Sequence, residues 1–438
     1  MDFQEEVRNA HSAPDQIEDL YQIAIDSHSI NQFRSAIDNL ANETPDNLLY
    51  QAWKVRLQRE LVEESWSSRQ MAYWKIAIPI AILSGITFWI LSNPDLKISD
   101  HFLALFLVWA PIAAFYVMVY LNLTNKTGYK WTLAIVACLI AGLTYIFLMS
   151  RGLSNRYQED YLTLMIIQMP LLAWIAVGIY ILWKNIPVEE HFAFLIKSFE
   201  VFITAGIYVI AGGVFTGITI GLFEALNLHI PELGVRFILA GGGGLIPVLA
   251  VASVYDPNLS PAAQDFKHGI SRYLAIILRL LLPLTLVVLV IYLMVIPTNF
   301  NQPFENRDVL IVYNLMLFAI MGLLIGATPV DVDELSQQIQ MVLRYGILLV
   351  AMLAVIVSLY AMSATLYRTI YGGLTINRLT IIGWNSINIV TLILLIYWQI
   401  RFKEEGWVNR IKRTFRVGSL GYCLWLIFTL IAIPIIFR

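Results

Sequence analysis

The amino-acid sequence predicts an all-α protein, a polytopic bundle of about eleven transmembrane helices with a small N-terminal helical domain in the cytoplasm. The chain has 438 residues, of which 58% are hydrophobic and only 14% charged, whereas a soluble domain usually carries roughly 25% charged residues. Its mean hydropathy is +0.68. From Trp74 onward, long apolar runs alternate with short polar breaks. These three observations predict a chain that belongs in a bilayer.

Residues 1–70 form the one region of soluble character, and their apolar residues recur at helical spacing. We expect helices over residues 15–26 and 30–40, and a longer helix from Pro45 towards Trp66. Thr44 and Pro45 suit an N-cap and a first helical turn. Two interpretations stay open for this domain. It is either a regulatory or dimerising domain that binds a cytoplasmic protein partner, or a segment that packs on the inner membrane face.

Residues 71–438 form the predicted transmembrane domain. A transmembrane helix needs roughly 20 predominantly apolar residues. The first run is short, contains Pro79 and follows a polar segment, so we expect a true span and no cleavable signal peptide. The predicted spans are residues 74–91, 102–123, 131–149, 162–183, 199–223, 235–254, 273–296, 309–327, 342–366, 377–399 and 418–437.

The distribution of lysine and arginine predicts the orientation, because cytoplasmic loops carry the excess. With the N-terminus in the cytoplasm and the C-terminus outside, 21 of the 29 basic residues lie on the inner side. The expected location is the inner or plasma membrane, in contact with lipid. In the last inner loop, Trp407, Ile411 and Phe415 recur every four residues among basic side chains. This pattern is typical of a helix lying in the headgroup layer.

Composition also excludes several classes of function. A net charge of -2 leaves no basic excess for nucleic acid. Cys138 and Cys423 both lie in apolar runs, which argues against a disulfide framework. The sequence contains no P-loop, HExxH, CxxC or GxSxG motif, and its six histidines are scattered. We therefore expect no cofactor and no metal, while the oligomeric state stays unknown.

Glycine is concentrated in the fifth and sixth predicted spans. Small residues at a spacing of four allow another helix to approach closely. Four consecutive glycines followed by proline weaken a helix interior and can break it in mid-membrane, as in transporters. The residues expected to act in helix packing or in a break are Gly213, Gly217, Gly221, Gly241, Gly242, Gly243, Gly244 and Pro247.

Polar residues at and below the outer ends of the spans are the candidate functional residues, because charge in a membrane must find a partner or water. Their opposite charges suggest a polar cap of ion pairs, which is either a ligand site or a seal. On the inner side, Arg279 either extends to the surface or pairs with Glu200. The candidates for substrate binding or the polar cap are Glu224, Arg236, Asp308, Asn314, Arg368, Asn377, Arg378 and Asn385.

The segment YRTIYGGLTINRLTIIGW begins at Tyr367 and contains a distinctive turn. Its residues Tyr371, Gly373, Leu374, Thr375 and Arg378 resemble the YGLTxxR motif of an uncharacterised bacterial multi-spanning family, domain of unknown function 4153. Gly372 is one residue more than that motif has. The resemblance implies a membrane fold and a bacterial membrane location, and it implies no activity.

Three functions therefore stay open. The first is a non-enzymatic protein of transport or channel type, with a route between the glycine-rich spans and the turn at Gly372. The second is a membrane sensor or envelope assembly factor that signals through residues 1–70. The third is an interfacial enzyme that acts on a lipid-linked substrate, using Asp308 or Glu224 together with Arg378. No sequence motif assigns a catalytic residue.

Overall fold

The computed structural model describes residues 3–27, 29–99, 101–125, 128–183, 187–228, 230–332, 335–401 and 406–438, without the side chains of residues 26, 59–72, 155, 307 and 308. Within these ranges every regular element is a helix, and the one β-type contact is an isolated bridge between Lys97 and Leu103. The predicted all-α class is confirmed. Backbone contacts divide the chain into two compact units, Met1–Lys75 and Ile76–Arg438.

The N-terminal unit consists of short helices around an aromatic core. Its elements are α1 (Phe3–Asn9), α2 (Pro14–Asp26), α3 (Ile30–Glu43) and the first part of α4 (Leu48–Leu91). Phe33 is fully buried and lies edge-on to Phe3 and Trp53, with ring centroids 6.0 and 5.8 Å apart. Edge-to-face contacts of this kind add to the energy of burial. This unit therefore has a core of its own.

The start of α4 differs from the predicted start at Pro45. Asn47 caps the helix, because its Oδ1 accepts hydrogen bonds from the backbone N–H groups of Leu49 and Tyr50 at 3.0 and 3.4 Å. Thr44, the predicted N-cap, instead donates its hydroxyl back to the carbonyl of Leu40 at the end of α3. The asparagine amide is an equally good cap and lies closer to the first buried residue, Tyr50.

The membrane unit contains eleven helical segments that are long and apolar enough to cross a membrane, counted over the described residues. The chain is therefore a multi-pass integral membrane protein, as predicted. The segments are Tyr73–Leu91 of α4, α5 (Ala104–Asn125), α6 (Tyr129–Ser150), α7 (Asn155–Leu182), α8 (Val188–Ala225), the segment Glu232–Val254, α11 (Gly269–Val295), α13 (Arg307–Ala327), α14 (Gln337–Gly372), α15 (Ile376–Arg401) and α16 (Trp407–Ile436).

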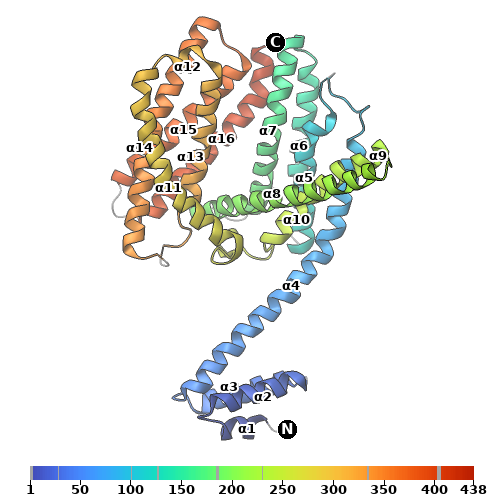
Figure 1. Ribbon diagram of the computed structural model, residues 1–438, viewed down its shortest axis with the longest axis vertical. Helices are drawn as coiled ribbons and strands as arrows, with labels where there is room; N and C mark the ends of the chain where they lie inside the picture. Colours follow the sequence, from blue (N-terminus) through green and yellow to red (C-terminus); the bar gives the residue numbers. More distant parts are fainter. Residues whose placement is uncertain are drawn as a thin grey trace. The chain divides into compact units, whose positions relative to one another are not determined.

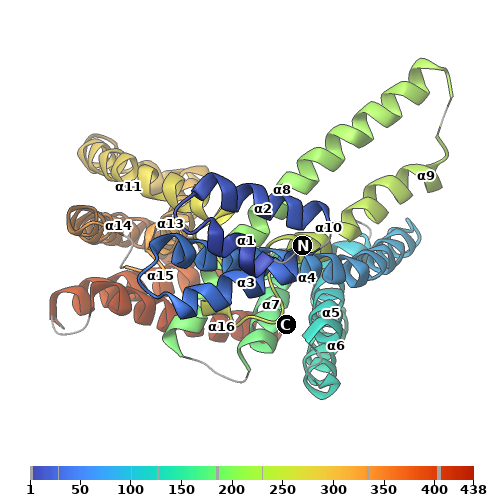
Figure 2. The ribbon, with the colours of Figure 1, turned by 90° about the horizontal axis from the view of Figure 1, so that it is seen from below.

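Three groups of helices make up this unit. α14 packs against α11, α13 and α15, and α15 packs against α16, while α5 packs against α6 and α7 (Figure 1). α8 packs against α10 (Gly242–Val254) and α16 along its first part, and its far end projects with α9 (Glu232–Arg236) away from the other helices (Figure 2). The face that carries the turn between α14 and α15 is called the turn face below; it also carries α12 (Gln302–Glu305) and the C-terminus (Figure 1).

The sixth span is helical throughout its glycine run. A π-helical turn, Phe237–Gly241, follows α9 and leads into α10 (Gly242–Val254). The irregularity is therefore a widened turn, and the unwound break, one of the two alternatives for these residues, is not formed. A Cβ on Gly244 would lie 2.9 Å from the Cα of Gly85, and one on Gly85 would lie 2.7 Å from the carbonyl oxygen of Gly241. Close packing against the first span explains Gly85 and Gly244, whereas a Cβ on Gly242 or Gly243 would meet nothing within 4 Å.

The glycines of α8 are different. A Cβ built on Gly213, Gly217 or Gly221 would meet no described atom within 4 Å outside its own helix. The side chains around them are exposed, including Val214 and Ile218. In this chain the predicted packing groove therefore has no helix in it.

The start of α16 corrects the prediction of a helix in the headgroup layer. Residues 407–436 form one helix, and Ile411 and Phe415 are buried in the main core of the membrane unit. One of the basic residues near them, Arg410, caps another helix. Arg410 donates to the carbonyls of Trp398 and Gln399 at the end of α15, at 3.4 and 3.2 Å. Such capping satisfies carbonyls that a helix end leaves unpaired.

Candidate functional site: an arginine cleft

The turn between α14 and α15 is built by the residues of the Tyr371–Arg378 motif. Gly373 has φ +77°, a conformation that side chains rarely adopt. Thr375 caps α15, since its Oγ1 accepts a hydrogen bond from the N–H of Arg378 at 3.3 Å. The Arg378 guanidinium bends back and donates to the carbonyl of Gly373 at 2.6 Å. Glycine, threonine and arginine therefore each have a local structural role in the turn.

A cleft of about 900 Å³ lies beside this turn, between α7, α13, α14 and α15. It is called the arginine cleft below. Its charged side chains are Arg156 and Asp160 from α7, Arg368 from α14 and Arg378 from α15. Neutral polar groups continue into it from the same four helices. They are Thr163, Gln168, Asn314, Thr365, Thr375, Asn377 and Thr380.

The arginine cleft has an excess of positive charge. Arg368 donates to the carbonyl of Glu305 at 3.2 Å, and Arg378 makes the turn contact described above. Among the side chains that the structure describes, no carboxylate lies within ion-pair distance of Arg156, Arg368 or Arg378. The predicted cap of ion pairs is not formed by these side chains. Three guanidinium groups face one described carboxylate, that of Asp160.

The walls of the arginine cleft become apolar away from the turn face. Ile167 and Leu171 on α7, and Ile311 and Phe318 on α13, line it. They are also surface residues, and Ile167 is 64% exposed. Exposed apolar side chains within a span contact lipid chains. The cleft therefore combines a cationic end at the turn face with an apolar side that borders the bilayer.

Two amide side chains in the cleft have their oxygens fixed by neighbours. Asn385 donates its amide to Asn314 Oδ1 at 2.8 Å, and Thr429 Oγ1 lies 2.7 Å from Gln168 Oε1. The amide nitrogens of Gln168 and Asn314 have no hydrogen-bond partner among the described residues. Gln168 is 1% exposed. Both nitrogens have almost no accessible surface, and buried polar groups are nearly always paired, so each lacks the partner that a ligand or an ordered water reaching it from the cleft would supply.

Four of the eight sequence candidates line this cleft, namely Asn314, Arg368, Asn377 and Arg378. Asn385 lies behind Asn314 and orients it. Arg236 is bound elsewhere, to Ser92 Oγ and the carbonyl of Trp89.

Glu224 is exposed at the end of α8. The side chain of Asp308 lies outside the described part of the structure. The predicted outer cluster is therefore separated, because α8 and α9 project away from the helices that form the cleft (Figure 2).

Arg156, Asp160 and Gln168 were not predicted as site residues. A signal was present, since Arg156, Asp160, Thr163 and Ile167 recur at helical spacing on one face of α7. Gln168 is also the single amide within the apolar stretch 161–183. An isolated amide in a span is expected to face protein or a cavity rather than lipid.

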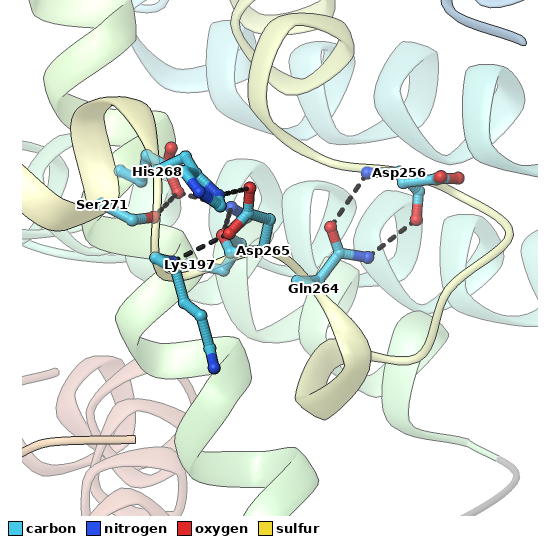
Figure 3. A network of polar contacts seen from close by, with 8 residues as sticks. Lys197, Asp256, Gln264, Asp265, His268 and Ser271 are labelled. Atoms are coloured by element: carbon cyan, nitrogen blue, oxygen red, sulfur yellow. Dashed lines mark hydrogen bonds and ion pairs between the residues drawn. The ribbon is translucent and has the colours of Figure 1, made fainter. Parts of the chain in front are cut away.

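A second polar cluster lies near the opposite face and serves a structural role. Lys197 on α8 pairs with Glu200 at 2.6 Å and donates to the carbonyl of Asp265 at 2.9 Å (Figure 3). Ser271 donates to Glu200. Arg279 donates to the carbonyl of Ala327 at 3.4 Å. Of its two alternatives, the pair with Glu200 is therefore not formed, and the partner of Glu200 is Lys197.

The connection between α10 and α11 is held by side chain to backbone contacts around this cluster. Gln264 accepts from the N–H of Asp256 at 3.0 Å and donates to its carbonyl at 2.8 Å (Figure 3). Burial raises the pKa of Asp265, but hydrogen bonds from the Lys267 N–H and His268 outweigh it and hold the pKa below its ordinary value. These contacts link residues 256 and 264 across the loop and pair the carboxylate of Asp265 within it.

An apolar cavity of about 400 Å³ lies on the other side of α7, between α5, α8 and α10. Trp109, Trp174, Phe194 and Phe202 contribute to its lining. The polar groups that border it are already paired, since Trp174 Nε1 donates to Ser198 Oγ at 2.9 Å. Lys197 and Tyr255 are among its few other polar lining residues, so this cavity offers mainly hydrocarbon contacts, and the arginine cleft is the better candidate for a specific site.

No described set of three or more His, Cys, Asp or Glu side chains comes together in a way that would hold a metal ion. The chemistry of the arginine cleft is instead that of hydrogen-bond donors and positive charge. Comparisons of the chain with protein-family models, with curated proteins and with solved structures find no match.

Proposed function

We propose that this membrane protein is of transport type and takes an anionic amphiphile into the arginine cleft. One observation carries the proposal: guanidinium groups from α7, α14 and α15 line one cleft whose other walls are exposed apolar side chains. Arginine binds phosphate and carboxylate groups through several hydrogen bonds. The headgroup would bind at the cationic end, while the tail stays among the lipid chains beside Ile167 and Phe318.

The interior of the bundle supports transport more than surface binding alone. The polar lining extends from the turn face to Gln168 and Asn314. Towards the opposite face, the core around Leu392, Leu395 and Phe415 is buried and mainly apolar, with a few buried polar side chains of the same helices, such as Asn388, Gln399 and Thr414. A cleft open to one side and closed by an apolar core on the other is the arrangement expected of one state of an alternating-access protein.

The location and orientation are part of the same proposal. The excess of lysine and arginine in the other loops supports a cytoplasmic N-terminus in a bacterial cell membrane, which puts the turn face and the C-terminus outside. The capped turn from Tyr371 to Arg378 supports membership in the family that carries the YGLTxxR motif. On this proposal the ligand enters from the outer leaflet or the space beyond it.

Reconstituted protein tests the function. Vesicles containing the full chain should move a fluorescent phosphatidylglycerol across the bilayer faster than a matched phosphatidylcholine. The double variant Arg368→Gln/Arg378→Gln should reduce the rate for the anionic lipid roughly tenfold or more, because a hydrogen bond to a charged group contributes about 1.5–3 kcal/mol. Arg151→Gln is the matched control, since Arg151 is exposed at the end of α6 and contacts Phe147 instead. Equal rates in all variants would contradict the proposal.

Cysteine labelling tests the orientation. In a Cys138→Ser/Cys423→Ser background, Tyr371→Cys places a thiol on the turn face, where Tyr371 is 76% exposed. Ala263→Cys places one in the exposed connection on the opposite face. An impermeant maleimide should label residue 371 in intact cells and residue 263 only after permeabilisation. The reverse pattern would invert the orientation.

A further inference from the structure

We propose that the headgroup taken by the arginine cleft is a diphosphate. This inference rests on the proposed function and names the chemical class of its ligand. It is carried by the kind, number and spacing of the hydrogen-bond donors that line the cleft. Each of these properties favours an elongated polyanion over a single small acid group.

The groups that the cleft leaves for a ligand are mostly donors. Guanidinium groups can only donate. The amides of Gln168 and Asn314 could in principle donate or accept, but their oxygens already have partners in Thr429 and Asn385. Their amide nitrogens, which can only donate, are therefore the atoms that lack a hydrogen-bond partner. A ligand that satisfies them must present several acceptor oxygens.

The donors are spread along the cleft. Asn385, which holds Asn314, lies seven residues after Arg378 on α15, which corresponds to about 10 Å along the helix. The Arg378 side chain bends back towards Gly373 and away from Asn314, so the two donors are not brought closer. Hydrogen bonds of about 3 Å at each end leave roughly 4–5 Å for the oxyanion itself. Two bridged phosphates fill that length, whereas one carboxylate does not.

The charge of the cleft agrees with this class. Arg156, Arg368 and Arg378 exceed Asp160 by two positive charges among the described side chains. A carboxylate would neutralise one of them, whereas a diphosphate ester carries at least two negative charges. In a site beside lipid, an uncompensated charge is costly. A diphosphate with two or three negative charges therefore matches the charge of the cleft better than a carboxylate does.

The test compares ligands that share one tail. Affinities of farnesyl diphosphate, farnesyl monophosphate and farnesoic acid are measured for the detergent-solubilised full chain, with inorganic pyrophosphate as the free anion. The wild-type protein should bind the diphosphate about tenfold more tightly than the monophosphate, and the carboxylate least well. Gln168→Met and Asn314→Leu remove the two donors with little change in volume. Each should reduce the advantage of the diphosphate to about twofold or less, by weakening the binding of the diphosphate more than that of the monophosphate.

Asn388→Leu is the matched control. Asn388 is a fully buried amide of α15 whose nitrogen is also unpaired among the described residues, but it does not line the cleft. This variant should retain the wild-type preference. If Asn314→Leu does not yield folded protein, as judged by size-exclusion chromatography, Gln168→Met alone decides the result.

The outcomes separate the two proposals. If Arg368→Gln/Arg378→Gln leaves all three affinities unchanged, the proposed function fails. If the arginine variants lose binding but the wild-type protein binds diphosphate and monophosphate equally, the diphosphate inference alone is overturned. Pyrophosphate that competes as strongly as farnesyl diphosphate would support the diphosphate site and overturn the amphiphile.

Discussion

Two adjacent glycines in the sixth span should respond in opposite ways to the same substitution. Gly243→Ala and Gly244→Ala both replace a helical glycine by alanine, a change that favours the helix by about 0.8–1.0 kcal/mol. At Gly243, a Cβ would meet nothing within 4 Å, so this gain should appear as higher stability. At Gly244, a Cβ would lie 2.8 Å from Phe88 Cγ and 2.9 Å from the Cα of Gly85.

The steric cost at Gly244 is set by backbone, which cannot move aside as a flexible side chain can. Overpacking of this kind costs about 1–3 kcal/mol. Allowing for the propensity gain, Gly244→Ala should range from nearly neutral to about 2 kcal/mol destabilising. The two variants should therefore differ by about 1–3 kcal/mol.

Thermal unfolding in detergent can resolve that difference. An unfolding entropy of about 2.1 cal/mol/K per residue gives about 0.9 kcal/mol/K for 438 residues. Each kcal/mol then moves the Tm by about 1 °C, so Gly243→Ala should melt about 1–3 °C above Gly244→Ala. Equal melting temperatures, or the opposite order, would refute the close approach of α10 to the first span.

Three other predictions concern the polar cluster near the opposite face and the turn. Lys197→Met leaves Glu200 buried without its partner and should cost about 3–5 kcal/mol, or about 3–5 °C in Tm. Lys197→Met/Glu200→Leu should recover most of that lost stability. No recovery would mean that the unpaired Glu200 carboxylate is not the cause of the loss. Because the folded-state pKa of Asp265 is lowered, its stabilisation is complete above its ordinary pKa of about 3.9 and is lost as the pH falls through the lower folded value. Hydrogen exchange of residues 256–268 should therefore accelerate in that acidic window, and Asp265→Asn should abolish the pH dependence; an unchanged profile would contradict it. Gly373→Ala imposes a positive φ on alanine and should lower stability by about 1–2 kcal/mol, whereas a Tm equal to that of the wild type would show that the turn adopts another conformation.

The number and order of the spans could be predicted because lipid imposes a simple rule on sequence. A span must be apolar over about 20 residues, and hydropathy detects that directly. Hydropathy misplaces the end of a span where that end is buried by other parts of the protein and not by lipid. The fifth span was predicted over residues 199–223, but α8 begins at Val188, because Phe192 and Leu195 are buried there beside the charged residues that hydropathy assigns to a loop.

The same limitation explains the last helix. Residues 407–417 contain four basic side chains and were assigned to the headgroup layer, whereas α16 begins at Trp407. Lys412 donates to the carbonyl of Val330 at 2.8 Å, and Arg410 caps α15. Positive charge near a membrane surface has two uses, since it can bind lipid headgroups or the backbone carbonyls of helix ends and loops. Composition does not distinguish them, because only the tertiary fold brings the carbonyls of other helices within reach.

The arginine cleft was only half predictable for a related reason. Arg368, Asn377 and Arg378 lie close together in sequence around one turn, so a local pattern identified them. Arg156 and Gln168 reach the same cleft from α7, more than 200 residues earlier in the chain, and periodicity alone cannot tell which helix faces which. The spacing of Arg156, Asp160 and Thr163 does mark one face of α7 as polar in a span that is otherwise apolar. A polar face on a membrane helix requires a partner or a cavity, and this requirement, applied to every span, would have pointed to α7 as the missing wall of the site.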